Sequence, residues 1–106
     1  MVADLIQQVW LQNEAQPAAD TSILASNLVP VNFPTIFKIQ VLMSNGGVFS
    51  VSYNDGATTQ VGILGTLTAG TVYLFDILVH LGDYINFQYS ATGGTIQLLR
   101  VIESFN

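Results

Sequence analysis

Residues 35–53 read Thr-Ile-Phe-Lys-Ile-Gln-Val-Leu-Met-Ser-Asn-Gly-Gly-Val-Phe-Ser-Val-Ser-Tyr, and this stretch decides the fold class. Apolar side chains occupy every second position on both sides of the Ser-Asn-Gly-Gly segment, as in Phe37 and Ile39 before it and Phe49 and Val51 after it. A period of two is typical of a half-buried β-strand. A glycine-rich turn between two such runs is typical of a hairpin. The stretch therefore predicts two antiparallel strands joined by a hairpin turn.

The same rhythm continues toward the carboxyl end of the chain. In the strand after Asn54-Asp55-Gly56, the pattern predicts that Val61 and Ile63 face inward. Further strands are predicted over residues 58–64, 71–79, 84–90 and 95–103. Strands that recur about every 8–12 residues indicate an antiparallel β-sandwich or a jelly-roll-like barrel. We therefore expect an all-β domain over residues 35–106, with about six or seven strands once an arm strand is included.

Residues 1–34 follow a different pattern, which predicts an N-terminal helix or extended arm followed by a connector. Over residues 2–13, apolar side chains recur three and four positions apart, which favours a short helix, although Leu11 interrupts the stripe. Residues 23–34 contain two prolines, which cannot donate to a sheet ladder and so favour an extended arm or an edge strand. The sequence leaves open whether residues 1–34 are helical or extended in an assembly.

The apolar stripe of this N-terminal segment is predicted to contact a neighbouring subunit. Tryptophan is enriched at the centres of protein interfaces, and a long connector lets the segment reach away from its own domain. The predicted contact residues are Leu5, Ile6, Val9 and Trp10. The alternative is that Trp10 covers the open end of its own sandwich.

The low charge of the chain points to self-association. Asp, Glu, Lys and Arg make up 8% of its 106 residues, whereas roughly 25% is usual for a soluble domain. The longest apolar runs are about five residues, far below the roughly 20 residues of a membrane-spanning helix. The first residues lack the basic region of a signal peptide, so none is expected. A surface covered by copies of itself or by a fixed partner explains a composition that would leave a free monomer poorly soluble.

Composition also argues against several functional classes. A net charge of −5 with only two basic residues is unsuited to nucleic acid or to an anionic membrane surface. The absence of cysteine removes disulfides and thiolate metal sites. His80 is the only histidine, and it lacks the neighbouring partners that a catalytic triad or a zinc site requires. We therefore expect no enzyme activity, no metal and no cofactor.

Two charged residues interrupt otherwise apolar strands. Asp76 lies within residues 71–79 and Arg100 within residues 95–103. One interpretation is a buried ion pair that gives specificity, and the other is that each residue lies at an edge and reaches water. Both strands are apolar on both faces apart from such positions, so their outer face needs a cover. The N-terminal helix, the apolar arm or another subunit are the candidates.

The order of elements from residue 71 to residue 103 resembles a known class. An apolar strand (Tyr73–Ile77) leads to a Gly82-Asp83 turn, then to a strand (Tyr84–Phe87), a Gly-Gly turn and a closing strand. This order resembles the carboxy-terminal half of small jelly-roll proteins displayed on virions, and of trimeric jelly rolls of the tumour-necrosis-factor and complement-head type. The resemblance implies a homo-oligomeric surface or decoration protein of a phage or archaeal virus, with a trimer among its assemblies. It carries over no functional residues.

The sequence thus favours a structural, self-assembling protein, a subunit of a virion that serves as a capsid decoration or surface protein. Its expected partners are copies of itself and a major capsid or filament protein, and its expected location is a virion surface or an extracellular assembly. One alternative is a subunit of an extracellular filament or pilus. Another is a carbohydrate-binding β-sandwich module, which would present exposed, coplanar aromatic side chains.

Overall fold

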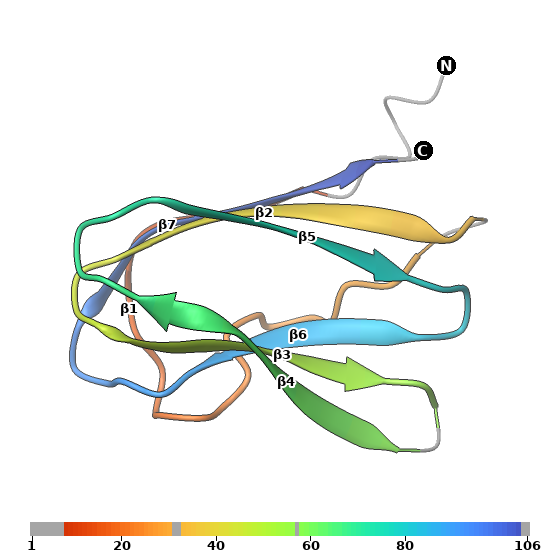
Figure 1. Cartoon of the computed structure of the whole chain (residues 1–106), viewed down its shortest axis with the longest axis horizontal. Helices are drawn as coiled ribbons and strands as arrows, with labels where there is room; N and C mark the ends of the chain where they lie inside the picture. The colour runs from red at the N-terminus through yellow and green to blue at the C-terminus, as the bar shows by residue number, and fades with distance from the viewer. Residues whose placement is uncertain (1–7, 31–32, 57, 105–106) are drawn as a thin grey trace.

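Two antiparallel β-sheets lie face to face in the computed structural model of the chain, as the two layers of Figure 1 show. The structure describes residues 8–30, 33–56 and 58–104. Sheet A has the strand order β1-β7-β2-β5, and sheet B has the order β4-β3-β6. The strands are β1 (Gln8–Ala15), β2 (Thr35–Met43), β3 (Gly47–Asn54), β4 (Thr59–Leu67), β5 (Tyr73–Val79), β6 (Tyr84–Tyr89) and β7 (Thr95–Ser104). The predicted all-β sandwich is confirmed.

The core lies between the two sheets and is built from the alternate, inward-facing residues of the central strands. Phe49 is at its centre, with its ring centroid 5.9 Å from that of Phe75 and 5.3 Å from that of Phe87. Stacked aromatic pairs of this kind add about 0.5–1.5 kcal/mol each beyond the burial of apolar area. The largest fully buried side chains are Tyr89, Phe37, Phe49, Phe87, Ile39, Met43, Ile85, Ile96, Leu99, Val41, Val79 and Val101.

Residues 20–28 run along the outer edge of β6 and complete sheet B on that side. The Ile23 amide donates to the Phe87 carbonyl at 2.8 Å, and Leu28 and Ile85 exchange two backbone hydrogen bonds of 2.9 and 3.0 Å. The predicted extended arm or edge strand agrees with this part of the chain. With this segment as an eighth, irregular strand, each sheet has four members and the topology is jelly-roll-like.

Asn86 fastens this segment to β6. Its side-chain Nδ2 donates to the Leu24 carbonyl at 3.0 Å and to Asn27 Oδ1 at 2.9 Å, while its Oδ1 accepts from the Leu24 amide at 3.0 Å. Asn86 is 4% exposed, and these bonds satisfy the polar atoms that burial takes away from water. The segment is therefore held by side-chain as well as backbone bonds.

The turn at residues 44–46 is not a hairpin, so that prediction is wrong. β2 belongs to sheet A and β3 to sheet B, and the turn carries the chain from one layer to the other. The glycine at position 47 is needed because a Cβ there would lie 2.8 Å from Cζ of Tyr89. The Tyr89 hydroxyl also donates to the Asn45 carbonyl at 2.7 Å, which ties the turn to sheet B. Glycine at this turn serves close packing between layers rather than strand pairing.

The helix predicted over residues 2–13 is wrong from Gln8 onward, and its first part lies outside the described residues. β1 pairs with β7, with Val9 opposite Val101 and Leu11 opposite Leu99. Over so short a run, the inward positions 9 and 11 fit a strand as well as a helix. Pairing with β7 satisfies the backbone along the strand, whereas a helix of about twelve residues is marginal in water. Leu11, which breaks the helical stripe, fits the strand pattern.

The inward placement of Val61 and Ile63 is also wrong. Val61 pairs with Ser52 and Ile63 with Ser50, so both side chains lie on the outer face of sheet B, 55% and 74% exposed. Gly62 lies opposite Val51 on the inner face. Strand alternation shows which residues share a face, but it does not show which face is buried. The inward apolar side chains of β4 come later, at Leu64 and Leu67, beyond the register shift between Phe49 and Ser50.

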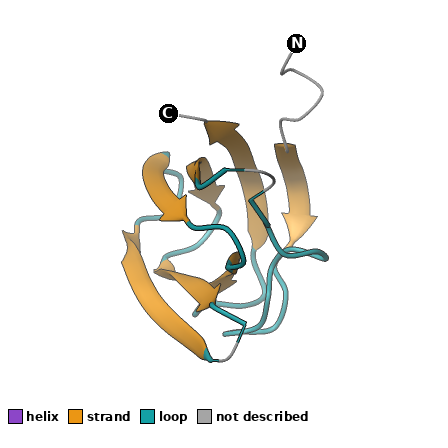
Figure 2. Ribbon diagram, turned by 90° about the vertical axis from the view of Figure 1, so that its right-hand side faces the viewer, coloured by secondary structure: helices purple, strands orange, loops and turns teal. Residues whose placement is uncertain are grey.

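Seen from the end of the sandwich in Figure 2, the two layers and the loops that join them are made without helices in the described residues. Accordingly, that part of the chain contains no helix with the length and apolar character to cross a membrane.

Candidate association surface

The outer face of sheet A carries more outward-facing apolar side chains than the outer face of sheet B, as the strand register shows. The register places Trp10 beside Arg100, Arg100 beside Gln40, and Gln40 beside Leu74, in one row across four strands. The next row runs from Ile102 through Lys38 to Asp76. This surface comprises Trp10, Ile36, Lys38, Gln40, Leu42, Leu74, Asp76, Leu78, Leu98, Arg100 and Ile102.

None of these side chains is buried in the described structure. Leu74 is 74% exposed and Trp10 is 59% exposed. Of the candidate covers within the chain, the described part of the N-terminal segment extends sheet A at its edge as β1, and residues 20–28 of the arm lie along β6 in sheet B. The apolar outer face expected for residues 71–79 and 95–103 is therefore present, and no described residue covers it.

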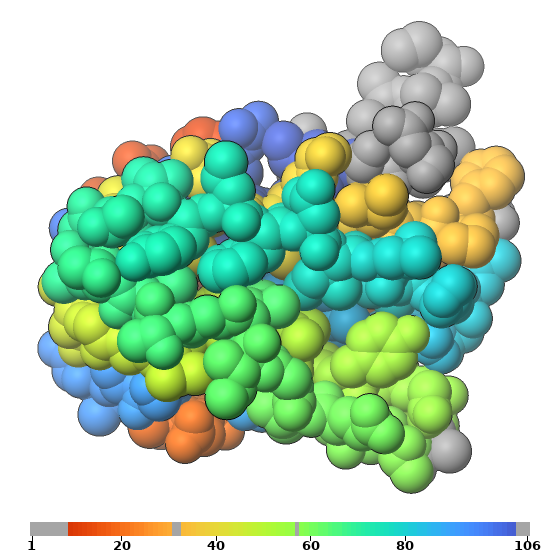
Figure 3. Space-filling model, viewed as in Figure 1, coloured from red at the N-terminus to blue at the C-terminus, as the bar shows by residue number. Residues whose placement is uncertain are grey.

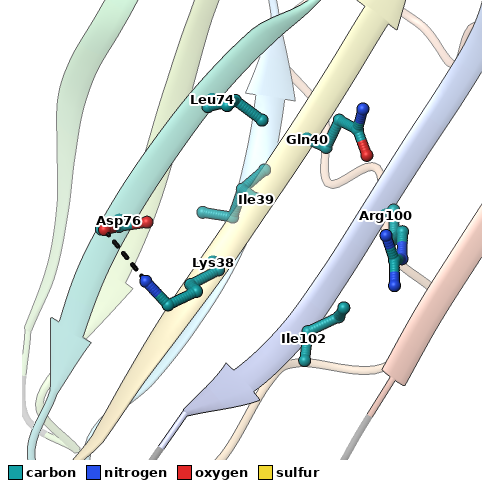
Figure 4. A pocket seen from close by; sticks show the side chains of 7 residues that line it. All are labelled: Lys38, Ile39, Gln40, Leu74, Asp76, Arg100 and Ile102. Atoms are coloured by element: carbon teal, nitrogen blue, oxygen red, sulfur yellow. Dashed lines mark hydrogen bonds and ion pairs between the residues drawn. The ribbon is translucent and has the colours of Figure 1, made fainter. Parts of the chain in front are cut away.

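A shallow hollow of about 520 Å³ opens in the middle of this face, between β5, β2 and β7 (Figure 4). Leu74 and Ile102 provide apolar walls on its two sides. Lys38, Gln40, Asp76 and Arg100 provide polar groups around it, and Ile39 contributes to its lining. An apolar hollow bordered by a few polar groups is a common feature of binding surfaces.

Asp76 and Arg100 do not form a buried pair, so that interpretation is wrong. β2 separates their strands, and Asp76 lies directly opposite Lys38 in the register, with Oδ2 3.5 Å from Lys38 Nζ (Figure 4). These two side chains are 62% and 56% exposed, so their ion pair contributes little to stability. Asp76 lies on the edge strand β5 and reaches solvent, as the other interpretation predicted. The buried acidic residue in the described chain is instead Glu103, at 3% exposure.

Arg100 points out from β7 toward β1. Its guanidinium carbon lies 5.4 Å from the centroid of the Trp10 ring, a cation–π contact. Within the described residues it forms no salt bridge with a carboxylate. The guanidinium therefore keeps several donors that a further acceptor could use.

Charge is unevenly placed on this molecule. Lys38 and Arg100 are the only basic residues of the chain, and both lie on the outer face of sheet A. Asp76 is the one acidic residue that the described register places there, although the chain has seven. Within a chain of net charge −5, the described part of this face thus carries two positive charges and one negative charge.

The predicted contact residues of the N-terminal segment have separate locations. Trp10 is exposed on the outer face of sheet A, whereas Val9 points inward and packs against the core of its own sandwich. Leu5 and Ile6 lie outside the described residues. Leu74 and Ile102 were not singled out from the sequence, although the two-sided apolar pattern of their strands was the signal that could have found them.

β4 forms a second exposed surface. It is the open edge of sheet B, and its sequence Thr-Gln-Val-Gly-Ile-Leu-Gly-Thr-Leu contains neither charge nor proline. Charged residues and prolines are the usual protection of edge strands against further pairing. In Figure 3, side chains of β4 and β5, coloured green to teal, make up much of the face toward the viewer.

A second hollow, of about 500 Å³, lies on the opposite side, between β1 and residues 23–26. Its walls include Val9, Leu11, Ile23 and Ile96, which belong to the edge of the core, and Glu14 lies at its margin. This hollow marks where β1 and the arm segment close the sandwich.

Tyr53, Tyr73 and Tyr89 each use their hydroxyl in a hydrogen bond within the fold. The Tyr53 hydroxyl donates to Asp83 Oδ2 at 2.5 Å, and this carboxylate raises the pKa of Tyr53 above its ordinary value. The Tyr73 hydroxyl accepts from the Thr68 amide at 2.9 Å, which lowers the pKa of Tyr73. Among large apolar side chains of the described residues, the exposed aromatics are Trp10 and Phe33. A glycan platform on the outer face of sheet A would therefore rest on one aromatic ring.

No group of three or more His, Cys, Asp or Glu side chains that could hold a metal ion occurs in the described part of the chain. His80 is exposed in the turn between β5 and β6. Comparison of the chain with protein families, with curated proteins and with solved structures finds no match.

Proposed function

We propose that this chain is a structural, self-assembling protein, a β-sandwich subunit of a virion surface. The observation that supports the proposal is the outer face of sheet A, where Leu74, Ile102 and Trp10 of three different strands all lie on the same uncovered face. Exposed apolar patches on soluble proteins commonly mark contact sites with other macromolecules. The low charge of the chain fits the same role, because charged residues are depleted at the centres of interfaces.

The fold adds a supporting analogy. Jelly-roll sandwiches serve as capsid subunits and also as lectin domains. Because one fold supports many functions, the fold supports both of these roles equally. The chemistry of the surface has to distinguish between them. A capsid or decoration role needs broad apolar contacts between subunits. A lectin role needs aromatic platforms and polar groups that meet a sugar, and here Trp10 would stand without a second coplanar ring.

A subunit of an extracellular filament remains the second candidate, and β4 favours it. In a filament, this open, uncharged edge would pair through backbone hydrogen bonds with an open edge of sheet A, β1 or β5, in the next copy, so that the contact can repeat. The partner in a virion would be a major capsid protein, and in a filament it would be the next subunit.

The test is the solution mass of the purified protein across a dilution series, measured by light scattering after size exclusion, with electron microscopy of the assembled fraction. Closed oligomers such as dimers or trimers support a decoration protein, and open-ended polymers support a filament subunit. A protein that stays at the 11.4 kDa chain mass at every concentration contradicts self-assembly. A monomer that binds glycans would establish the carbohydrate-binding alternative.

A further inference from the structure

We propose that two copies of the chain pair through the exposed edge of sheet B, β4 against β4 in antiparallel orientation, with Val61 of each copy opposite Val61 of the other. A two-fold axis then passes between the two valines, and sheet B of one copy continues into sheet B of the other. This inference rests on the proposed self-assembly and names a contact and a symmetry for it. The contact does not use the outer face of sheet A.

The first half of β4 is attached to the rest of the fold on one side only. Residues 59–63 are all exposed, although Val61 and Ile63 are apolar and lie within a strand. Among the described strands, β3 is their hydrogen-bonded neighbour, and β4 ends the sheet. Figure 1 shows this half of β4 apart from sheet A, which the strand approaches only toward its end. The outer edge of residues 59–63 is therefore accessible to another strand.

The hydrogen bonds of sheet B show which backbone groups of β4 point away from β3. The Asp55 amide donates to the Thr58 carbonyl at 3.3 Å, so these two residues form a hydrogen-bonded pair. In an antiparallel ladder such pairs alternate with non-hydrogen-bonded pairs, so every second residue of β4 from Thr58 onward bonds to β3. The residues between them, Thr59, Val61 and Ile63, direct their N–H and C=O groups to the open edge. The register shift after Ile63 ends this row.

This row is complementary to itself in an antiparallel arrangement. With Val61 opposite Val61, each Ile63 lies opposite Thr59 of the other copy, so the outward residues of the two strands face one another. Their N–H and C=O groups then form about six backbone hydrogen bonds across the edge. On the other face of the sheet, Gln60 lies opposite Gly62, which leaves room for the longer side chain. The register therefore satisfies the edge without a steric conflict between the paired strands.

The side chains of the row also suit this pairing. Val61 is 55% exposed and Ile63 is 74% exposed in the single chain. In the pair, Val61 meets Val61 at the axis and Ile63 meets Thr59, and β-branched neighbours of this kind stabilise antiparallel sheets. Pairing removes apolar surface from water, which favours association. Since β4 contains no charged residue, the contact places no like charges opposite each other within the paired strands.

The open edges of sheet A are less suited to pairing with themselves. β5 has Asp76 at its centre, so two β5 strands in full antiparallel overlap would place two carboxylates opposite each other. β1 is interrupted at Asn13, whose φ of 56° departs from strand geometry. Of the edge strands in the described structure, β4 alone combines an uncharged sequence with a regular run of five exposed residues.

Pairing through one edge buries less surface than contact between two sheet faces. Interfaces of this small size form and dissociate reversibly. The pair should therefore separate on dilution, and one substitution at its axis should have a large effect on its affinity.

Substitutions at the axis test the pairing. Val61→Lys and Val61→Glu each place two like charges opposite each other in a pair of the same variant, so each alone should associate more than about tenfold more weakly than the wild type. An equal mixture places a lysine opposite a glutamate and should associate with an affinity near that of the wild type. Light scattering across a dilution series gives the masses, and native mass spectrometry identifies the mixed pair. The matched control is Val29→Lys, at an exposed valine beside the opposite edge of sheet B, which should leave association unchanged.

Disulfide formation tests the register, because the chain has no cysteine of its own. The two Cα atoms of a hydrogen-bonded pair lie about 5.5 Å apart, within the reach of a disulfide. Val61→Cys should therefore form a covalent dimer on mild oxidation. Ile63→Cys should do so at least about tenfold more slowly, because its counterpart in the other copy lies roughly 14 Å away along the strand, beyond that reach.

An oligomer whose mass is unaffected by either charge at position 61, or folded variants that fail to combine on mixing, would overturn the β4 pairing and leave self-assembly intact. Equal rates of cross-linking for the two cysteine variants would overturn the two-fold register. Circular dichroism of each variant shows whether it is folded. A wild-type protein that is monomeric at every concentration would overturn self-assembly itself.

Discussion

The hydroxyl of Tyr53 donates a hydrogen bond of 2.5 Å to the carboxylate of Asp83, and this bond joins the end of β3 to the turn that enters β6. This turn carries the chain from β5 in sheet A to β6 in sheet B. A side chain of β3, in sheet B, therefore fixes the point at which the chain enters that sheet. The carboxylate, with burial as a smaller cause, raises the pKa of Tyr53.

Tyr53→Phe should lower the free energy of unfolding by about 1 kcal/mol at pH 7, a value reduced by the partial exposure of the pair. Since the pKa of Tyr53 is higher in the folded than in the unfolded chain, its contribution is complete below pH 10 and is lost as pH rises through the folded value. Urea unfolding of both proteins should therefore show a constant difference between pH 7 and pH 9 that shrinks above pH 10. Tyr84→Phe, at a hydroxyl without a hydrogen bond in the described residues, is the control and should show no such change.

Asn86→Ala should be the more damaging polar substitution. It leaves both the amide and the carbonyl of Leu24 without their partners at a buried position, which costs about 2–3 kcal/mol. Gln88→Ala, two residues along the same strand, should cost less than about 0.5 kcal/mol. Urea denaturation followed by circular dichroism measures both, and equal losses would contradict the role of Asn86 in holding residues 20–28.

Trp10→Ala should weaken association but leave the sandwich folded. Its ring is exposed and its contact with Arg100 is worth about 0.5–1 kcal/mol at such a site, so the loss of stability should stay below about 1 kcal/mol. Leu11→Ala, at the neighbouring inward position, should cost about 2 kcal/mol. A Trp10 variant that loses its β-sheet circular dichroism would show that this residue is needed by the single chain.

Asp76→Ala should change the unfolding free energy by less than about 0.5 kcal/mol when measured at concentrations where the chain is monomeric. The reason is the solvent exposure of its ion pair with Lys38. A loss of several kcal/mol in the monomer would instead indicate that the carboxylate is buried.

Strands with a strict period of two were predictable from the sequence alone. Residues 84–90 show this best, since Ile85, Phe87 and Tyr89 are all buried in β6. The two-sided apolar character of β5 and β7 was likewise predictable, and it indicated that their outer face is apolar and needs a cover.

What the sequence could not reveal depends on distant partners. The glycines after Asn45 look the same whether they close a hairpin or make room for Tyr89 between two layers. β1 is a strand because β7 lies beside it, and residues 9 and 11 carry no local information about that neighbour. The distance from Asp76 to Arg100 depends on the strand order, which places β2 between them.

Residues 20–28 occupy the outer edge of β6, and this has a consequence for growth. Within sheet B of the described structure, only the edge at β4 leaves a row of backbone N–H and C=O groups without a neighbouring strand. A ribbon that lengthens strand by strand needs two open edges on each member. A pair joined β4 to β4 would end at both sides in an edge already filled by its own chain, so β4–β4 pairing stops at two copies and does not seed a fibre.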